Sequence, residues 1–399
     1  MNILQVINSA SPLGGGPIES ILQAARAVAE HGHTMEIVSV DDPSAPWLES
    51  MPVRVHALGP ARTPYRYSGQ LVPWLREHAD DYDCAVVNGI WLYPSYAVWR
   101  VLARRRIPYF VYAHGLLDPS HHRTFPVRRL KKMVSWVATE RRVLDDAAAV
   151  LFTCEEERRG AEQAFWPPRA RDNGAILPYC IGAPPSDITR QTEAFLARYP
   201  ELRDRRRLLF LSRVHPKKGL DLLIRAFAAQ ADRDETLHLV VAGTGDPAYV
   251  ASLQALSQSL GIERRMTWTG MLTGDLKWGA FRTAEAFLLP SHHENYGIAV
   301  VEALACGTPV VISSAINIWP EIEADEAGLI CDDNAASAAT ALGRWLDLDP
   351  AARLGMRDRA AACFATRFSA EQACRQFLDL LRASGVGDRP RPSRTIAAT

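Results

Sequence analysis

The chain has 399 residues, 48% of them hydrophobic, so it is long enough for two domains that each bury their own core. Its 45 basic residues balance 45 acidic ones, which excludes the overall positive charge typical of nucleic-acid-binding proteins. The 7 cysteines are scattered singly and form no Cys-x-x-Cys pair. This usage is typical of reduced cytosolic proteins rather than of a disulfide framework or a zinc site.

Nothing in the sequence predicts a membrane span. No apolar run reaches the ~18 residues expected of a spanning helix. Met1 leads directly into a strand pattern without a signal-like segment. We therefore expect a cytoplasmic protein.

Short apolar runs alternate with helical patterns along the whole chain. This alternation predicts an α/β fold with parallel sheets joined by crossover helices. The strands predicted in the first half are residues 2–8, 34–40, 84–88, 108–113 and 148–153. Those predicted in the second half are residues 207–212, 237–242, 285–289 and 309–312.

The predicted domains are residues 1–182 and 207–367, each Rossmann-like. Residues 183–206 contain prolines and a charged run, and we place a hinge or linker there. Residues 368–385 have apolar side chains at helical spacing, which predicts a helix. Residues 386–399 turn basic and proline-rich, as in a disordered tail.

A basic loop follows the predicted strand 207–212 and turns into a helix at Gly219. The carboxyl ends of strands are where open α/β sheets bind ligands. Arg213 and Lys218 lie five residues apart in this loop and could clamp both phosphates of a diphosphate, Arg through its planar fork and Lys as a point charge. The alternative interpretation is a solvated basic turn.

Two carboxylates, Glu294 and Glu302, lie eight residues apart around a predicted helix start at Gly297. The amides of Tyr296, Gly297 and Ile298 would face the loop mouth, and a helix N-terminus favours a diphosphate there. Glu302, about a turn and a half into the helix, could reach the hydroxyls of a ribose.

A plainer interpretation of the same acids makes Glu294 a helix-dipole partner and Glu302 a solvated side chain. Apolar residues flank Glu302 on both sides, however, so it lies beside a buried face where an idle carboxylate is costly. This context favours a binding role for the pair.

The basic loop and the paired acids, in this order and about eighty residues apart, resemble the retaining glycosyltransferases of family 4, which have the GT-B fold. The resemblance covers most of the chain. It implies two facing Rossmann-like domains, an acceptor-binding first and a nucleotide-sugar-binding second. It also implies that the helix at 368–385 crosses back to the first domain.

By this resemblance, Arg213 and Lys218 bind the donor diphosphate, Glu294 binds the transferred sugar and Glu302 binds the ribose. The amides at Tyr296, Gly297 and Ile298 complete the expected donor site.

Two further matches lie in the first domain. Gly15 and Gly16 belong to the triple glycine that matches the family's glycine-rich loop after the first strand, and His114 matches a histidine that borders the transferred sugar. The family's acceptor-facing loops correspond to residues 14–17, 62–67 and 91–94.

Two positions depart from the family pattern. Tyr296 replaces the usual phenylalanine before Gly297, which leaves the backbone amides in place. Residues 177–182 read Leu-Pro-Tyr-Cys-Ile-Gly, without the Asn-Gly that commonly ends the first domain. We therefore do not expect the interdomain contact of that asparagine.

Other chemistries fit the sequence less well. Asp-x-Asp occurs at 81–83, 232–234 and 347–349, near element ends where Asp caps turns, and adjacent His292 and His293 would point apart. We therefore expect no metal. A dinucleotide oxidoreductase is disfavoured because neither glycine cluster completes Gly-x-Gly-x-x-Gly. A non-catalytic nucleotide-sugar-binding protein stays open.

The expected activity is metal-independent transfer of a hexose from a GDP- or UDP-sugar to a hydroxyl acceptor, without another cofactor. Retention at the anomeric carbon is implied by the family. The resemblance extends to bacterial enzymes of lipopolysaccharide and exopolysaccharide assembly, so the acceptor is expected to be a glycan or lipid-linked. No nucleic-acid partner is expected.

Residues 126–144 form a predicted amphipathic helix with one basic face. The basic residues are Arg128, Lys131, Lys132 and Arg142, and the apolar ones opposite are Val127, Leu130, Val134, Val137 and Leu144. The face is either solvated or a peripheral contact with anionic lipid at the inner membrane.

Overall fold

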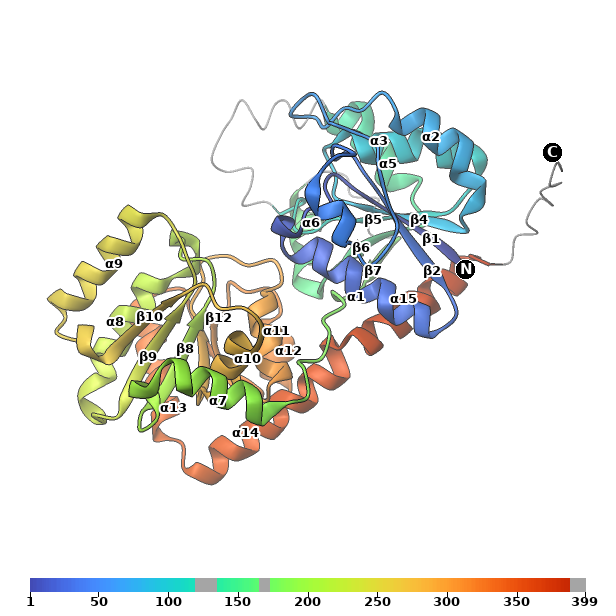
Figure 1. The fold of residues 1–399 in the computed structure, drawn as a ribbon. Coiled ribbons are helices and arrows are strands. Elements are labelled where there is room, and N and C mark those ends of the chain that lie inside the picture. The colour runs from blue at the N-terminus through green and yellow to red at the C-terminus, as the bar shows by residue number, and fades with distance from the viewer. Residues whose placement is uncertain (119–134, 165–172, 388–399) are drawn as a thin grey trace. The chain divides into compact units, whose positions relative to one another are not determined.

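The chain divides into two compact units (Figure 1), each described here by itself. The first unit comprises Met1–Cys180 and Ala370–Thr399, and the second comprises Ile181–Ser369. The computed structural model describes residues 1–118, 135–164 and 173–387. Among these residues, no helix is long and apolar enough to cross a membrane.

A seven-stranded sheet forms the centre of the first unit, in the order β3-β2-β1-β4-β5-β6-β7, with every pairing parallel. The strands are β1 (Asn2–Ile7), β2 (Thr34–Ser39), β3 (Val55–Ala57), β4 (Cys84–Asn88), β5 (Tyr109–Tyr112), β6 (Ala149–Phe152) and β7 (Gly174–Ile176). The central strands β4, β5 and β6 are buried along their whole length, because helices cover both faces of a parallel sheet.

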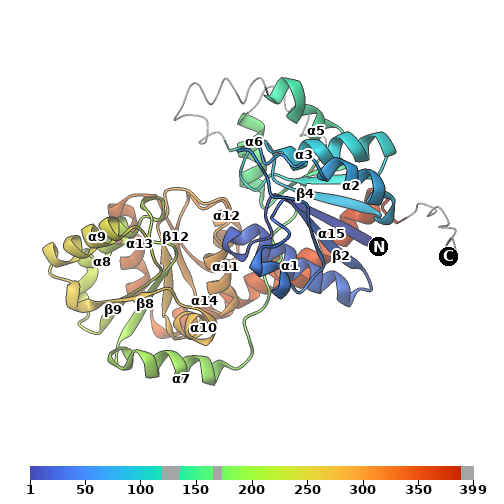
Figure 2. The same cartoon turned by 45° about the horizontal axis from the view of Figure 1, so that its top comes forward.

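Helices of the first unit are α1 (Gly16–Glu30), α2 (Leu71–His78), α3 (Tyr93–Val98), α5 (Arg141–Asp145), α6 (Glu155–Ala164) and α15 (Ala370–Ala383). The last of them, α15, lies beside α1 although more than 330 residues separate them in the chain (Figures 1 and 2). Its apolar face, including Phe377 and Leu381, is buried. The expectation that the C-terminal helix returns to the first domain is thus confirmed.

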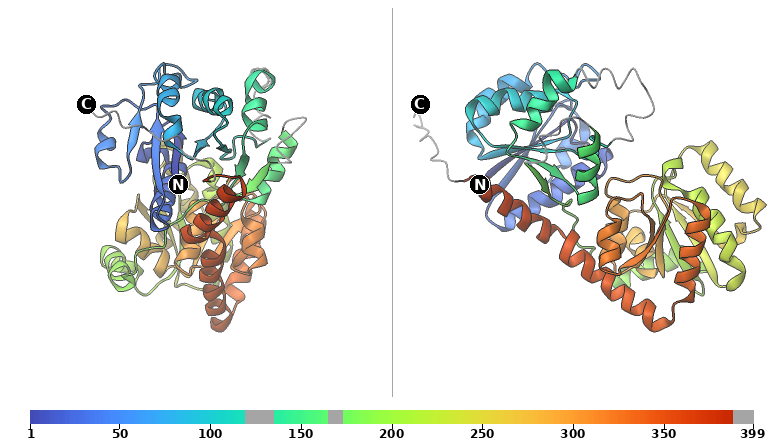
Figure 3. Two further views of the ribbon diagram at one scale, coloured as in Figure 1. Left: turned by 90° about the vertical axis from the view of Figure 1, so that its right-hand side faces the viewer. Right: turned by 180° about the vertical axis from the view of Figure 1, so that it is seen from behind.

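The second unit has a six-stranded parallel sheet in the order β10-β9-β8-β11-β12-β13, with helices on both faces (Figure 3). Its strands are β8 (Arg206–Leu211), β9 (Leu237–Ala242), β10 (Met266–Gly270), β11 (Ala286–Leu289), β12 (Val310–Ser313) and β13 (Gly328–Cys331). Its helices are α7 (Ile188–Arg198), α8 (Leu220–Gln230), α9 (Pro247–Ser259), α10 (Gly274–Thr283), α11 (Ile298–Ala305), α12 (Trp319–Ala324), α13 (Ala335–Asp347) and α14 (Pro350–Cys363).

All nine strands predicted from the sequence are present, with ends within one residue of the prediction. The four strands that the sequence analysis missed, β3, β7, β10 and β13, are the edge strands of the two sheets. Most of their residues are only half-buried, so they lack the continuous apolar run of a central strand.

The structure corrects the predicted hinge at 183–206. Residues Ile188–Arg198 form α7, which packs against α10 within the second unit. Gly279 permits the close approach, because a Cβ there would overlap the backbone of Gln191. The side chain of Gln191 accepts a hydrogen bond from Arg282 Nε at 2.6 Å. The boundaries between the units fall instead after Cys180 and after Ser369.

Residues 126–134 of the predicted basic helix at 126–144 lie outside the described residues, as does most of the predicted tail at 386–399. Within the described part, Val143 and Leu144 are buried as expected. Val137, assigned to the apolar side, is 74% exposed, because residues 136–140 form a π-helical turn that shifts the side-chain spacing.

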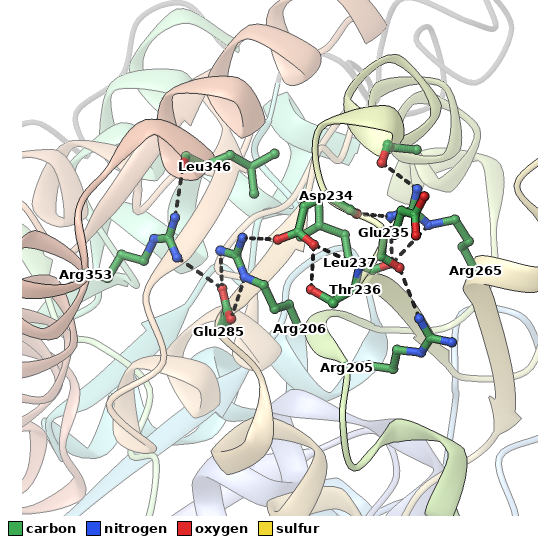
Figure 4. Close-up of polar contacts among 11 residues, drawn as sticks. Arg205, Arg206, Asp234, Glu235, Thr236, Leu237, Arg265, Glu285, Leu346 and Arg353 are labelled. Carbon is green, nitrogen blue, oxygen red and sulfur yellow. Dashed lines mark hydrogen bonds and ion pairs between the residues drawn. The ribbon is translucent and has the colours of Figure 1, made fainter.

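An ion-pair network joins the amino ends of β8, β9 and β11 in the second unit (Figure 4). The Arg206 guanidinium binds both carboxylate oxygens of Glu285, at 2.9 and 2.8 Å, and donates to Asp234 at 2.7 Å. The Thr236 hydroxyl, then Arg206, holds the pKa of Asp234 at about 2. These side chains are 24–30% exposed, so solvent screens the network only in part.

We expect Arg206→Gln to lower the free energy of unfolding by about 1–2 kcal/mol, because a bidentate pair and a second charge-assisted hydrogen bond are lost. Urea denaturation would measure this. Ionised Asp234 stabilises the fold above its ordinary pKa of 3.8 and loses this effect as the pH falls through about 2. The cost of the substitution should therefore be full at neutral pH and shrink near pH 2.

The matched control is Arg203→Gln, which removes a pair with Glu193 at 3.3 Å between side chains that are 47% and 61% exposed. It should cost less than about 0.5 kcal/mol. Equal costs for the two substitutions would contradict the stabilising role of the network.

Candidate active site

Three loops of the second unit meet at the carboxyl edge of its sheet, after β8, β11 and β12. The His292 amide, after β11, donates to the carbonyl oxygen of Lys217, after β8, at 2.9 Å. The Glu294 amide donates to the carbonyl of Ala315, after β12, at 3.0 Å, and the Asn317 amide returns a bond to Glu294 at 3.1 Å. The backbone of Glu294 is therefore fixed from both sides.

Glycines allow these loops to approach one another. Gly219 has φ +65° and faces the carbonyl oxygen of Pro290, which a Cβ would overlap. Gly243, with φ +141°, and Gly245 lie equally close to carbonyl oxygens in the loop after β8. Gly243-Thr-Gly245 is one of the two glycine clusters that fall short of a dinucleotide-binding motif, and packing between the loops after β8 and β9 explains its glycines.

Lys218 and Glu294 form an ion pair between the loops after β8 and β11. Their side chains are 18% and 16% exposed, so neither charge is well solvated. Burial, followed by the charges of Arg213 and Lys217, lowers the pKa of Lys218 to about 8. With a pKa of about 8 the ammonium is mostly charged at neutral pH, as the ion pair with Glu294 requires.

Arg213 lies at the start of the same loop, and it is exposed. Its charge contributes to the lowered pKa of Lys218. The loop continues through a 3₁₀ turn at Pro216–Lys218, where His215 Nδ1 accepts the Lys217 amide at 3.1 Å. Two cations from one loop are thus presented at the carboxyl end of β8, as the sequence predicted.

Helix α11 begins beside the ion pair. Its N-cap is Gly297, with φ +80°, so the amides of Gly297 and Ile298 stand at a helix N-terminus, where they suit an anion. Tyr296 is buried and packs edge-to-face on Phe368, with ring centroids 6.1 Å apart. The predicted helix start at Gly297 is confirmed.

Glu302 lies on α11 and forms an ion pair with Lys277 of α10, Nζ to Oε1 2.5 Å. The Lys277 ammonium also lies 4.6 Å from the ring centroid of Trp278. Glu302 is 14% exposed. Sequence reasoning missed Lys277, because a lysine 25 residues before the acid, on another helix, carries no local signal.

Several of the side chains considered above as metal ligands form ion pairs or close contacts with other side chains. Asp347 pairs with Arg233, Asp234 with Arg206, and His292 Nδ1 lies 3.2 Å from Asp333. Among the described residues, no group of three or more His, Cys, Asp or Glu side chains is arranged to hold a metal ion.

In the first unit, Gly15 has φ +75° and ψ −139°, a conformation that essentially only glycine adopts. It caps α1, whose first residue is Gly16, just after β1. The triple glycine thus starts a helix at the carboxyl edge of the first sheet.

His114 follows β5 and has φ +50°, which is unusual for a residue with a side chain. Its ring stacks on Tyr112 at 4.6 Å. Nε2 lies 3.1 Å from Asn88 Oδ1, which can only accept, so Nε2 carries the proton and Nδ1 accepts the Tyr179 hydroxyl at 2.7 Å. Burial lowers the pKa of His114 to about 3, so the ring is neutral.

The loop after β5 is also held by a carboxylate that the sequence analysis missed. Buried Glu157 accepts the Gly115 amide at 2.5 Å and both the amide and the hydroxyl of Thr153 at 2.6 Å. Tyr179 lies in the segment 177–182, which lacks the family's Asn-Gly. This departure was the only signal in the sequence for the contact of Tyr179 with His114.

Glu140 is a second acid that the sequence analysis missed. Its side chain is fully buried in the π-helical turn at Trp136–Glu140, and burial raises its pKa to about 7. The backbone amide of Trp91, in the loop after β4, offsets part of this rise, although neither carboxylate oxygen of Glu140 has a hydrogen-bond partner among the described residues.

Family profiles match both parts of the chain. The profile described as "Glycosyl transferase 4-like domain" matches residues 15–173, and "Glycosyl transferases group 1" matches residues 192–361. The fold resembles that of Anabaena Alr3699/HepE in complex with UDP and glucose, with a TM-score of 0.73 and 20% identity, covering 96% of this chain and 100% of that one. A glycosyltransferase of Rickettsia africae ESF-5 gives a TM-score of 0.77 at 15% identity, covering 97% and 99%.

Two parallel-sheet units with this arrangement of loops define a GT-B protein, the α/β class predicted from the sequence. The chain belongs to glycosyltransferase family 4, a family of enzymes that transfer sugars.

Among curated relatives, the D-inositol 3-phosphate glycosyltransferase of Salinispora tropica is 32% identical over 192 residues, covering 46% of this chain and 39% of that protein. The protein of that name from Corynebacterium jeikeium is 32% identical over 189 residues, covering 45% of each. The chain therefore spans less than half the length of these relatives.

We expect Glu140→Gln to stabilise the protein at alkaline pH. The folded-state pKa of about 7 exceeds the ordinary 4.5, so the folded form binds the proton more tightly, and stability falls as the pH rises between these values. Glutamine does not ionise, so the variant should gain about 1–3 kcal/mol over the native chain at about pH 8 and little below pH 4.5.

Urea denaturation across this pH range tests the expectation. Glu193→Gln, at a carboxylate that is 61% exposed, is the control and should change the pH profile little. A Glu140→Gln variant that is less stable than the native chain at pH 8 would show that the carboxylate has a favourable partner.

Proposed function

We propose that this chain transfers a hexose from a nucleoside diphosphate sugar to a hydroxyl acceptor, with retention at the anomeric carbon and without a metal ion. The observation that carries the proposal is the convergence of Lys218, Glu294 and the start of α11 at one edge of the second sheet. The family membership supports it, as do the names of the relatives.

The donor diphosphate would bind Arg213, Lys218 and the amides of Gly297 and Ile298. As the bond from the anomeric carbon to the diphosphate breaks and the acceptor oxygen bonds to that carbon, negative charge grows on the leaving group. Donors already aimed at this charge stabilise the transition state more than the ground state. These groups supply the charge compensation that a divalent cation gives in other transferases.

Lys218 and Glu294 would exchange partners when the donor binds. Without the donor they neutralise each other. The diphosphate offers Lys218 a more highly charged partner, and Glu294 is then available to accept hydrogen bonds from sugar hydroxyls. The ion pair thus holds both side chains near their places of action.

Glu302 would accept the two ribose hydroxyls. Its contact with Lys277 keeps the carboxylate ionised and oriented, which is the state that accepts hydrogen bonds. His114 is a positioning residue in this scheme, because both of its ring nitrogens are engaged within the first unit. By family resemblance, it borders the sugar.

The acceptor is proposed to be a glycan or a lipid-linked glycan of a bacterial cell surface, reached at the inner face of the membrane. The carbohydrate chemistry of the family supports the glycan, and the family resemblance supports the cell-surface role. The donor is proposed to carry guanine or uracil, and the affinities for GDP and UDP distinguish the two.

We expect Lys218→Ala to weaken the binding of UDP or GDP by about 1.5–3 kcal/mol, because a charge-assisted hydrogen bond to the diphosphate is lost. Glu294→Gln should leave nucleotide affinity within about twofold and abolish transfer, because the acid contacts only the sugar. Calorimetry with both nucleotides and release of free nucleoside diphosphate from the sugar donor measure the two effects.

Lys217→Ala is the matched control, an exposed lysine in the same loop, and should bind nucleotide nearly as the native chain does. The pKa of about 8 for Lys218 adds a pH test: affinity should fall as the pH rises past 8, and Lys218→Arg should abolish this fall. Unchanged affinity in Lys218→Ala would refute the phosphate assignment. Binding without release of nucleoside diphosphate would identify a binding protein instead.

Chelation tests whether transfer requires a divalent metal ion. Transfer should continue in EDTA at the rate of the untreated enzyme, because cationic side chains and helix amides already compensate the diphosphate charge. Loss of turnover in EDTA, with recovery on adding magnesium or manganese, would overturn the proposed chemistry of the site.

A further inference from the structure

A row of contacting aromatic side chains runs through the first unit from the carboxyl edge of its sheet, with Tyr93 buried in the middle and the other rings partly exposed. Tyr65 and Tyr67 lie in the loop after β3 and are 40% and 46% exposed. Both rings contact Tyr93 at the start of α3, with centroids 6.0 and 4.7 Å away. The Tyr93 amide donates to the carbonyl oxygen of Tyr65 at 2.8 Å, which fixes the loop to the helix.

The row continues along the helix away from that edge. The centroid of Tyr96 lies 6.2 Å from that of Tyr93 and 5.7 Å from that of Trp99. Tyr96 and Trp99 pack one side against the core and leave the other partly exposed. The indole Nε1 of Trp99 donates to Asp146 at 2.8 Å, so the orientation of this ring is fixed.

The row ends in a pocket with a cavity volume of about 400 Å³. Its lining residues are Tyr96, Trp99, Arg100, Ala103, Arg104 and Asp146. The segment Trp99–Ala103 is a π-helical turn, whose five-residue spacing brings Trp99 and Arg104 to one side. Such turns are frequent at functional sites.

Positive charge predominates around this pocket. Arg100 and Arg104 are exposed, and only Asp146 opposes them among the lining residues. Arg100 lies over the Tyr96 ring at 5.9 Å and donates to its hydroxyl at 2.8 Å, which extends its guanidinium along the aromatic surface. A flat apolar surface next to two guanidinium groups suits a ring-shaped ligand that bears a carboxylate or phosphate.

We propose that the row from Tyr65 to Trp99, with Arg100 and Arg104, is a second carbohydrate-binding site, which holds an acidic part of the acceptor glycan remote from the reacting hydroxyl. The partly exposed rings on either side of buried Tyr93 contact the apolar faces of successive sugars, and the arginines bind acidic substituents. This inference rests on the proposed function, since it takes the acceptor to be a glycan. A growing polymer would be retained there between transfers.

The test is calorimetry of the full chain with a hexamer of galacturonic acid and with neutral cellohexaose. The acidic hexamer should bind more tightly than the neutral one. The double variant Arg100→Ser/Arg104→Ser should lower the affinity for the acidic hexamer at least about tenfold, because two charged contacts are lost. Its affinity for the neutral hexamer should fall less. Arg106→Ser, at an exposed arginine outside the pocket, should change neither.

Trp99→Ala should weaken both hexamers, and Trp99→Phe should restore part of the binding because the ring is kept. Failure of the acidic hexamer to bind, or equal binding in the double arginine variant, overturns the proposal. The proposal is also overturned if neither hexamer binds and the same residues are instead required for binding single-stranded DNA or anionic vesicles. That result would assign the surface to another partner.

Nucleotide binding separates this inference from the proposed function. The double arginine variant should bind UDP or GDP as the native chain does, because the donor-site residues belong to the second unit. A native chain that binds the acidic hexamer but neither nucleotide would refute the proposed function alone. A native chain that binds nucleotide but neither hexamer would refute the second site alone.

Discussion

The ion pair of Lys218 and Glu294 is the interaction on which the donor-site geometry depends. Both side chains are less than one-fifth exposed, and removing two charges from water costs several kcal/mol each unless they are paired. The pair therefore fixes two loops from separate strands in the absence of any ligand. An anionic ligand that binds Lys218 takes the place of the Glu294 carboxylate, so its binding requires little rearrangement of the loops.

Close backbone packing makes this pair possible. In a parallel sheet all loops after the strands leave from one edge. Gly219, Gly243 and Gly245 let neighbouring loops pack closely, because a Cβ at any of them would overlap a carbonyl oxygen of the next loop. These backbone contacts fix the loops to one another and to the sheet beneath them. A rigid framework of this kind positions charged side chains more precisely than mobile loops would.

Central strands and donor-site motifs could be predicted because their signals are local in the sequence. A buried parallel strand is a continuous apolar run, and Glu294 and Glu302 lie on either side of one helix start. Edge strands such as β3 were missed because solvent contact mixes their residue types. Lys277 and Glu157 were missed because their partners lie on other elements, and only the folded chain brings them together.

The return of α15 to the first unit has a consequence for synthesis on the ribosome. Residues Ile181–Ser369 form a continuous unit that lies between α1 and α15 in the sequence, so α1 meets α15 only after this whole unit has been made. Until then the side of α1 that packs against α15 stays uncovered. Nascent chains that stall before Ala370 therefore expose a surface that chaperones and proteases recognise.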